Sequence, residues 1–217
     1  MSKAFTRLGK EIVMAVKEGG PNPETNSRLR AAMQNAKGVN MPKDRVEAAI
    51  KRASSKEEKN YEEVVYEGYG PHGIAILVET ATDNINRTVA NMRVYFSRGG
   101  GAVGKTGSLD FIFTRKGIFK IAPEGVDVEE LELELIDFGA DDIYEHEGEI
   151  IVETAFTDFG AMQKALEEKG LNVISADLQR IPNTRTELTD EQAEEIENLV
   201  EKIEEDDDVQ AVYHNMA

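Results

Sequence analysis

The chain has 217 residues, no cysteine and a formal net charge of −17 at pH 7. The lack of cysteine excludes disulfides, thiolate metal ligands and a cysteine nucleophile. No apolar run approaches the roughly 18 residues of a membrane span, and no apolar segment of a signal peptide follows the N-terminus, so we expect a cytoplasmic protein without a membrane partner.

The charge is unevenly distributed along the chain. Residues 1–60 carry 13 Lys and Arg against 7 Asp and Glu, whereas residues 186–217 carry 1 against 12. Residues 115–185 are also acidic, with 7 against 17. Charges are screened over about 8–10 Å at physiological salt, so a basic head (residues 1–60) can meet a polyanion while an acidic body stays in solvent.

The basic head is predicted to form three short helices. Apolar residues recur at steps of three and four in the first, which ends at Gly19-Gly20-Pro21. Leu29 and Met33 mark the second, which ends at Gly38, and Pro42 suits the first turn of the third. The apolar stripe of the first helix consists of Phe5, Leu8, Ile12 and Val16.

The remaining sequence predicts strands mixed with helices. Residues 61–114 indicate two strands around a Gly-Pro-His-Gly turn, a helix over 86–98 and a strand over 108–114. Residues 116–182 read strand-helix-strand-strand-helix-strand, with a turn at Lys116-Gly117 in the first strand run, which is typical of a ferredoxin-like unit. Residues 186–217 add a long acidic helix, capped by Thr189, and a final strand.

We therefore predict an α+β protein of three domains. The first is an N-terminal three-helix bundle over 1–60. The second is a discontinuous α+β domain over 61–114 plus 186–217. The third is an inserted ferredoxin-like domain over 115–185.

The glycine-rich run SRGGGAVGKTG over 97–107 matches the spacing of a phosphate-binding P-loop. A working P-loop follows a strand and opens a helix, but here a helix precedes the loop and a strand follows it. We therefore interpret Gly99–Gly101 as a helix exit that needs left-handed residues, and keep a P-loop nucleotidase only as an alternative to be tested at Lys105.

No other group predicts an enzyme. The three histidines lie far apart in the sequence, so we expect no metal site, no cofactor and no catalytic residue. We interpret His214 as structural and His72 as a turn residue. The acidic run Glu204–Asp208 lacks the ligand spacing of a calcium loop and is predicted to be a solvated turn.

Cationic residues are the strongest candidates for binding, because phosphate contacts need such clusters. The alternative is a solvated, helix-supporting surface. In the basic head the candidates are Lys10, Arg28, Arg30, Lys37, Lys43, Arg45, Lys51 and Arg52. A second group comprises Asn84, Asn86, Arg87, Arg93, Arg98 and Lys105, of which we select Arg87, Arg98 and Lys105.

Several runs resemble the YebC family in order along nearly the whole chain. They are FTRLGKEIVMAVKEGGPNPETNSRLRAAMQNAK with the following NMPKD, YEGYGPHGIAILVET, DNINRTVANMRVYFSRGGGAVGKTGSLDFIF, and EEDDDVQAVYHNM. The resemblance implies a three-domain α/β protein with a helical N-terminal domain. Members usually carry a further basic segment ahead of the first helix, and loss of those charges would weaken phosphate affinity.

The resemblance implies a non-enzymatic regulator of gene expression. Members are described as probable transcriptional regulators, a mitochondrial relative activates translation of cytochrome c oxidase subunit I, and bacterial relatives resemble ribosome-associated factors. It favours a ribosome-associated translation factor, with the basic head and the loop Asn40–Lys43 on ribosomal RNA. The alternatives are a DNA-binding transcriptional regulator and an acidic protein-interaction module. We favour a monomer, although the sequence leaves the oligomeric state, targets and choice of RNA or DNA open.

Overall fold

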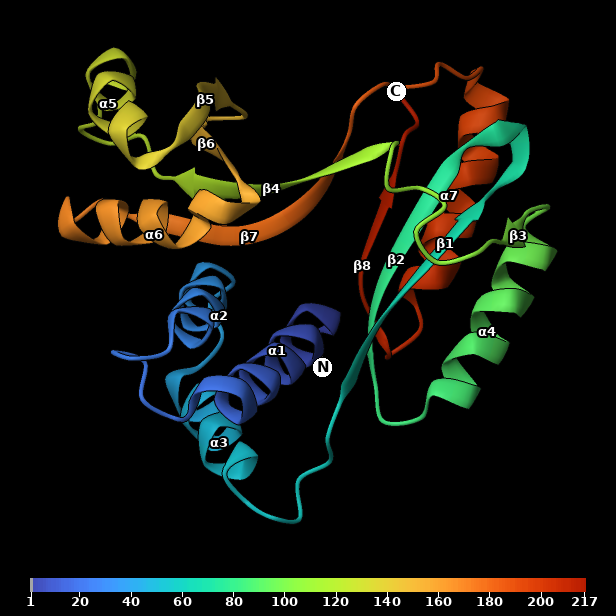
Figure 1. Cartoon of the computed structure of the whole chain (residues 1–217), viewed down its shortest axis with the longest axis horizontal. Helices are drawn as coiled ribbons and strands as arrows, with labels where there is room; N and C mark the ends of the chain where they lie inside the picture. Colours follow the sequence, from blue (N-terminus) through green and yellow to red (C-terminus); the bar gives the residue numbers. More distant parts are fainter. Residues whose placement is uncertain (1) are drawn as a thin grey trace. The chain divides into compact units, whose positions relative to one another are not determined.

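The computed structural model describes residues 2–217 and divides into two compact units. Unit 1 contains the chain up to Glu58 and Arg115–Gln179, and unit 2 contains Lys59–Thr114 and Arg180–Ala217. Both units contain helices and strands (Figure 1), which confirms the predicted α+β class. No helix among residues 2–217 is long and apolar enough to cross a membrane.

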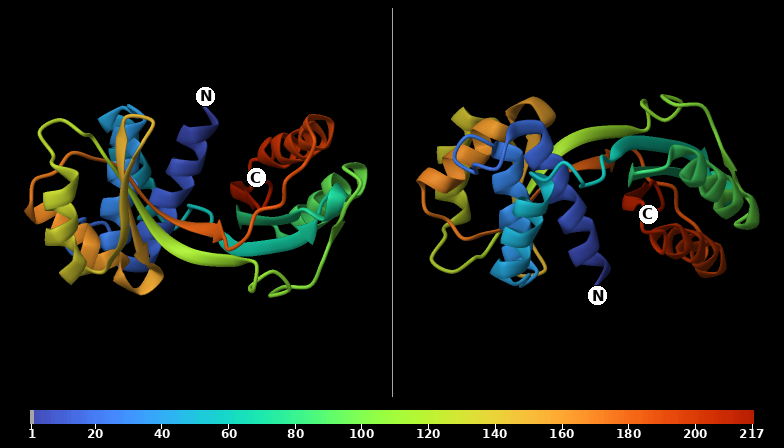
Figure 2. Two further views of the ribbon diagram at one scale, coloured as in Figure 1. Left: turned by 90° about the horizontal axis from the view of Figure 1, so that it is seen from above. Right: turned by 90° about the horizontal axis from the view of Figure 1, so that it is seen from below.

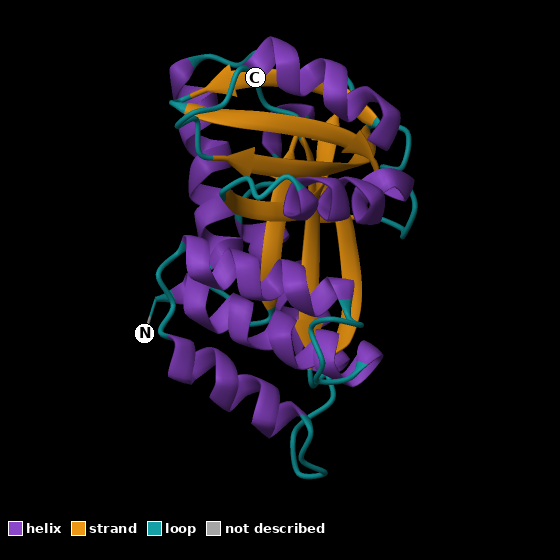
Figure 3. Ribbon diagram, turned by 90° about the vertical axis from the view of Figure 1, so that its left-hand side faces the viewer, coloured by secondary structure: helices purple, strands orange, loops and turns teal. Residues whose placement is uncertain are grey.

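The N-terminal part of unit 1 is helical, as predicted. It consists of α1 (Lys3–Gly19), α2 (Ser27–Gly38) and α3 (Lys43–Ala53). Figure 3 colours the helices of the protein purple and its strands orange. Asn26 joins the first two helices: its side-chain oxygen accepts from Leu29 N at 3.0 Å, and its amide donates to Ala15 O at 2.7 Å. This buried residue therefore caps α2 and also fixes its position beside α1.

The rest of unit 1 is the ferredoxin-like element predicted from the sequence. Its elements are β4 (Phe113–Ile121), α5 (Val128–Leu135), β5 (Ala140–His146), β6 (Glu149–Ala155), α6 (Phe159–Glu168) and β7 (Val173–Pro182). The strands lie in the order β5-β6-β4-β7, and the β4–β6 and β5–β6 pairs are antiparallel. Phe119, Leu135 and Leu166 are among the fully buried residues of the core between this sheet and its helices.

Helix α2 lies against β7, an edge strand of this sheet (Figure 1). The Asn35 amide donates to Ala176 O at 3.0 Å, and its oxygen accepts from Ala176 N at 2.7 Å. Gln34 also donates to Val173 O, and Ala31 packs into the core of the sheet. The side chain of Asn35 thus satisfies backbone groups that an edge strand would otherwise leave unpaired.

These contacts join the basic head and the inserted segment in one unit. Ser27 O accepts from the Gln163 side chain at 3.3 Å, which adds α6 to the same contact. The division into three domains stays a prediction, because the basic head and the inserted segment belong to the same compact unit.

Unit 2 is a second antiparallel sheet with two helices on one face. The strands β1 (Glu62–Tyr69), β2 (Ala75–Thr82), β3 (Ala102–Val103) and β8 (Val209–His214) lie in the order β3-β1-β2-β8. Helices α4 (Ile85–Arg98) and α7 (Asp190–Glu204) lie side by side (Figure 2). Their residues Met92, Phe96 and Leu199 pack against the sheet, and Thr189 forms the predicted cap of α7.

The predicted strand over 108–114 is wrong for residues 108–112. These residues form consecutive turns, and Leu109 packs together with Phe113, Ala75 and Leu77 on the sheet face opposite the helices. The strand β4 begins only at Phe113 and runs straight through Lys116-Gly117, where the sequence had favoured a turn. Apolar residues that cover a sheet face resemble a strand in sequence, because both are short and buried.

Candidate nucleic-acid interface

Two of the candidate arginines in the basic head are engaged within unit 1. The Arg28 guanidinium contacts Glu11 at 2.7 Å and Glu18 at 2.5 Å. Arg30 contacts Glu167 at 3.1 Å and donates to Pro23 O at 2.8 Å. Both side chains are about 30% exposed. These arginines therefore connect helices to each other, and their charge is largely compensated by neighbouring carboxylates.

The other six candidate cations of the basic head lie at least partly on the surface. Lys10 is half-buried on α1, whereas the remaining five are exposed at the end of α2 and along α3. The side chains of two of these, Lys37 and Lys51, form no hydrogen bond or ion pair with any of residues 2–217. The five exposed cations, which we call the α2–α3 cationic surface, are Lys37, Lys43, Arg45, Lys51 and Arg52.

Three members of the α2–α3 cationic surface have loose internal contacts. Lys43 is 90% exposed and lies 3.6 Å from Glu47, and Arg52 lies 3.0 Å from Glu58. The Arg45 guanidinium lies 5.9 Å from the centre of the Phe5 ring, within the range of a cation–π contact. The Lys43–Glu47 pair is exposed on both sides and contributes little stability, so it can be exchanged for a phosphate contact at small cost, whereas the Glu58 partner of Arg52 is only 13% exposed.

The loop between α2 and α3 is held in a tight conformation. Asn40 adopts a positive φ of 56°, and Met41 N donates to Ala36 O at 2.8 Å. Val39 at the end of α2 is 43% exposed. The loop Asn40–Lys43, which is predicted to contact RNA, begins close to Lys37 at the end of α2 and ends at Lys43, the first residue of α3. It therefore lies within the α2–α3 cationic surface.

The residues of the second candidate group have different roles in the structure of unit 2. Arg87, near the start of α4, contacts Asp208 at 2.8 Å and Asp83 at 2.8 Å. Asn84 caps the same helix by accepting from Arg87 N. Arg98 lies eleven residues further along α4, which is about 16 Å of helix. The structure therefore does not bring Arg87 and Arg98 together.

The prediction of a solvated turn at Glu204–Asp208 is wrong for two of its members. Asp208 is only 4% exposed; besides Arg87 it accepts from the hydroxyls of Thr82 and Thr88 at 3.1 and 2.9 Å. Asp206 accepts from the Tyr95 hydroxyl and from the amide of Asn91, both at 2.9 Å. These two carboxylates hold the turn before β8 against α4. The acidic sequence of this segment alone does not indicate such contacts.

Asp83 completes this cluster of charges in unit 2. Hydrogen bonds from Lys59 and Arg87 lower the pKa of the Asp83 carboxyl to about 2. Lys59 lies 2.5 Å from Asp83. The Arg87 guanidinium is thus bound by two carboxylates, and only about half of its side chain is exposed.

The glycine-rich run resembling a P-loop is occupied by a carboxylate of the protein itself. Glu67 on β1 is 3% exposed and accepts from the backbone N–H groups of Gly107 and Ser108, the latter at 3.1 Å. Its own carbonyl accepts from Gly104 N at 2.7 Å. Amides that would face a phosphate in a P-loop therefore face Glu67, and Lys105 is exposed on the same loop.

The start of the glycine-rich run forms the predicted helix exit. α4 ends at Arg98, and Gly100 adopts a left-handed φ of 79°. A Cβ on Gly99 would lie 2.6 Å from Leu199 of α7. The glycines here therefore end a helix and allow a second helix to approach, as the chain order of the elements had indicated.

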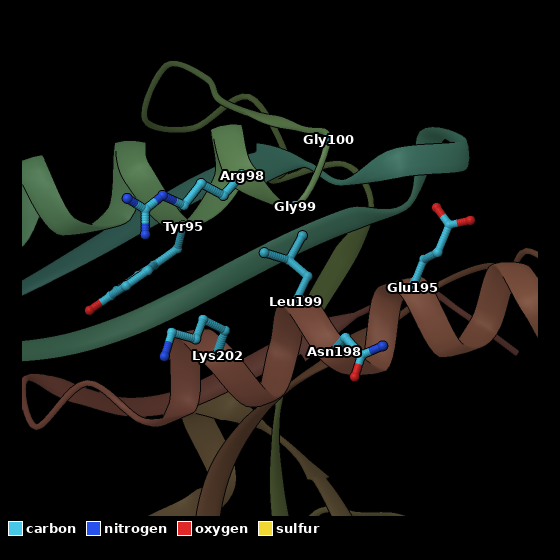
Figure 4. Close-up of a pocket in the computed structure, with 8 residues that line it drawn as sticks. All are labelled: Tyr95, Arg98, Gly99, Gly100, Glu195, Asn198, Leu199 and Lys202. Atoms are coloured by element: carbon cyan, nitrogen blue, oxygen red, sulfur yellow. The ribbon is translucent and has the colours of Figure 1, made fainter.

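A groove of about 550 Å³ lies between α4 and α7 (Figure 4). Arg98 and Tyr95 come from α4, and Lys202 and Glu195 come from α7. Burial and the hydrogen bond to Asp206 raise the pKa of Tyr95 to about 12. The groove has mixed charge, because its lining includes Arg98, Lys202 and Glu195. Arg98 forms no ion pair within the described chain, whereas Lys202 lies 2.5 Å from Glu205.

Two of the histidines lie in unit 2 and differ in surroundings. His72 has a positive φ of 61° in its turn, and its Nε2 lies 3.0 Å from Glu195. His214 is half-buried on β8, where burial and the nearby Arg185 lower its pKa. Among residues 2–217, no group of three or more His, Asp or Glu could hold a metal ion.

Comparisons with known proteins match the whole described fold. A family profile described as the TACO1/YebC protein N-terminal domain matches residues 1–56, and one described as the TACO1/YebC second and third domain matches residues 61–216. A protein of Cytophaga hutchinsonii, named "Probable transcriptional regulatory protein", is 69% identical over 217 residues, which is 100% of this chain and 91% of that protein. One of the same name from Flavobacterium johnsoniae is 59% identical over 216 residues and is covered to 91%.

A solved structure has the same fold. The crystal structure of the conserved hypothetical protein Aq1575 from Aquifex aeolicus superposes with a TM-score of 0.86 at 37% identity, over 99% of this chain and 89% of that one. Both family profiles and these relatives agree with the resemblance inferred from the sequence. The chain belongs to the TACO1/YebC family.

Proposed function

We propose that the protein is a regulator of gene expression that binds nucleic acid through the α2–α3 cationic surface, as a ribosome-associated translation factor. The observation that carries this proposal is the pair of exposed lysines, Lys37 and Lys51, that have no carboxylate partner among residues 2–217 although the chain has an excess of acidic residues. The names of the relatives, which are probable transcriptional regulatory proteins, support a role in gene expression.

The residues of α3 favour folded RNA over specific duplex DNA. Its sequence KDRVEAAIKRA contains no Asn, Gln, Ser or Thr, and it carries Asp44 and Glu47 beside its cations. Recognition helices commonly read base edges with amide, hydroxyl and guanidinium side chains, and of these α3 offers only the guanidinium groups of Arg45 and Arg52. Contacts from Lys37, Lys43 and Lys51 would instead hold the phosphate backbone of an RNA that is recognised by its shape.

The experiment is cosedimentation with ribosomes as a function of salt. The double variant Lys37→Glu, Lys51→Glu should lose binding, and wild-type binding should fall steeply as salt increases, because released counterions drive phosphate contacts. The matched control is Lys164→Glu, Lys202→Glu, which changes the net charge equally on α6 and α7 and should bind as the wild type does. Arg28 and Arg30 are unsuitable for this test because their reversal would disrupt unit 1.

The proposal fails if the Lys37, Lys51 variant pellets like the wild type while remaining folded. A competition experiment separates the second candidate, DNA binding. If random duplex DNA at equal phosphate concentration displaces the protein from ribosomes and a defined promoter gives a footprint at physiological salt, the transcriptional reading is the correct one. Crosslinking in cells, mapped to both the RNA position and the protein residue, then identifies the contact on the ribosome.

A further inference from the structure

The outward face of α5 and of the short 3-10 helix η2 (Ile136–Phe138) that continues it combines exposed apolar side chains with carboxylates. On the inner face, Leu131 and Leu135 are buried in the core of unit 1. On the outer face, 75% of the surface of Leu133 and 55% of that of Ile136 are exposed. Residues three apart share a helix face, so these two side chains form one apolar ridge.

Acidic residues border this ridge without basic partners. Glu129 and Asp137 lie four positions before and after Leu133, and Glu132 lies four before Ile136. All three carboxylates are exposed, and none forms an ion pair within the described residues 2–217. The chain has no Lys or Arg between Lys120 and Lys164, so no nearby sequence offsets these charges.

Helix α7 is a useful contrast, because it is also strongly acidic. Its main apolar residues, Ile196, Leu199 and Ile203, are all buried against the sheet of unit 2. The acidic surface of α7 is therefore explained by solvation. The same explanation does not account for Leu133 and Ile136, since adjacent exposed apolar side chains gain free energy only when a partner covers them.

We propose that the ridge of Leu133 and Ile136, with its border of carboxylates, docks a cationic amphipathic segment of another protein. Nucleic acids and anionic lipid headgroups are repelled by the acidic border within the screening length. Apolar side chains of the partner bury the ridge, and its Lys or Arg side chains compensate Glu129, Glu132 and Asp137. This surface lies outside the α2–α3 cationic surface, so the inference does not depend on the proposed function.

The probe is a fluorescently labelled synthetic peptide of Leu and Lys at helical spacing, titrated with the full-length protein and followed by anisotropy. The double variant Leu133→Ser, Ile136→Ser should weaken binding at least about tenfold, because it removes both buried contacts. The matched control is Val94→Ser, which removes an apolar side chain that is 43% exposed on α4 and should leave binding unchanged. A peptide with Ser in place of Leu should not bind.

A second variant keeps the result interpretable if the first loses stability. Glu129→Lys leaves the apolar ridge intact and should weaken binding while reducing its salt dependence. Amide chemical shifts of the labelled protein should change along α5 and not along α7. The proposal is overturned if the Leu133, Ile136 variant binds the peptide as tightly as the wild type, or if shifts spread equally over both acidic helices. It is also overturned if the protein alone forms a dimer that this variant abolishes, because the occupant is then a second copy.

Discussion

The two units use different chemistry where a helix meets strands. In unit 1, Asn35 bonds both backbone groups of Ala176 with a neutral amide, at 2.7 and 3.0 Å. In unit 2, Asp208 holds α4 through the guanidinium of Arg87 and the hydroxyls of Thr82 and Thr88. One contact is neutral, and the other requires an ionised carboxylate that is almost fully buried.

This difference between the two units separates the cations that hold the fold together from those that are available to bind a ligand. Amides of Gln34 and Asn35 attach α2 to β7, and Arg28 and Arg30 pair with carboxylates of other helices, so the exposed cations at the end of α2 and on α3 take no part in the attachment. Because α4 is attached by an ion pair, Arg87 is committed to the fold. Lysines and arginines that look equivalent in sequence thus have separate roles, which depend on the polar group that a neighbouring element offers.

The largest effect is expected when the charged contact of unit 2 is broken. Asp208→Ala should lower the free energy of unfolding of unit 2 by about 3 kcal/mol, because Arg87 and two threonine hydroxyls lose their buried partner. The measurement is urea unfolding followed by amide signals of unit 2. Asp207→Ala, at the exposed neighbouring position, is the control and should cost less than about 0.5 kcal/mol. A loss below about 1 kcal/mol for Asp208→Ala would show that Arg87 is solvated instead.

Breaking the neutral contact of unit 1 should cost less. Asn35→Ala should destabilise unit 1 by about 2 kcal/mol, because it leaves the N–H and carbonyl of Ala176 without this partner. Hydrogen exchange at the Ala176 amide reports the contact directly and should accelerate. Asn35→Asp should be at least as harmful, since a carboxylate cannot donate to the carbonyl and would lie beside Asp177. Unchanged exchange at Ala176 in both variants would contradict the edge-strand role of Asn35.

A smaller loss of stability than for Asn35→Ala is expected when the contact of Glu67 with the glycine-rich loop is removed. Glu67→Ala should cost about 1 kcal/mol and accelerate hydrogen exchange at Gly107 and Ser108, whose amides lose their acceptor. Glu67→Gln keeps an oxygen at this position and serves as the conservative control, with a smaller change. If Gly107 and Ser108 remain protected in the alanine variant, the loop holds its shape without Glu67.

The smallest effect concerns Asp177, which also accepts from Asn35 at 2.9 Å. Burial raises the pKa of the Asp177 carboxyl and Glu11 adds to this, while Lys120 and Asn35 act in the opposite direction. Folding thus favours the protonated form of Asp177 relative to the unfolded chain. The contribution of Asp177 to stability should therefore be largest below about pH 4, and it should be lost as the pH rises through the folded-state pKa.

Asp177→Asn tests this pH dependence, because an amide cannot ionise. The variant should be more stable than the wild type at neutral pH, by less than about 1 kcal/mol, and the difference should vanish at acidic pH. Thermal melts between about pH 3 and pH 7 provide the measurement. A variant that is less stable at neutral pH would mean that the ionised carboxylate is satisfied by its neighbours.

Much of the fold could be predicted from local patterns. The cap at Thr189 and the stop at Gly38 depend on a few adjacent residues, so they are readable without tertiary contacts. The strand-helix order of the inserted segment likewise predicted a ferredoxin-like unit, and its sheet has the strand order β5-β6-β4-β7. Residues 108–112 were misread as a strand, because their apolar residues cover a sheet instead of joining it.

The candidate site was only partly readable, for a different reason. The clustering of Lys and Arg in the basic head is a property of the sequence, but the pairing of Arg28 with Glu11 and Glu18 is not. Asn35, Glu67 and Asp208 gave no usable signal, since single polar residues in helices, strands or acidic runs are usually solvated. Their importance follows from partners that are distant in the chain.

The sequence by itself determined the α+β class, the order of elements, the polarised charge and the family resemblance, because periodicity, caps and composition act over short stretches. Only the tertiary structure decided that the glycine-rich run holds Glu67, that Arg87 binds Asp208 and that Lys37 and Lys51 remain without a partner among residues 2–217. The physical reason is that the role of a polar side chain depends on the partner that folding brings within hydrogen-bond distance, and that partner is not encoded in its neighbours along the chain.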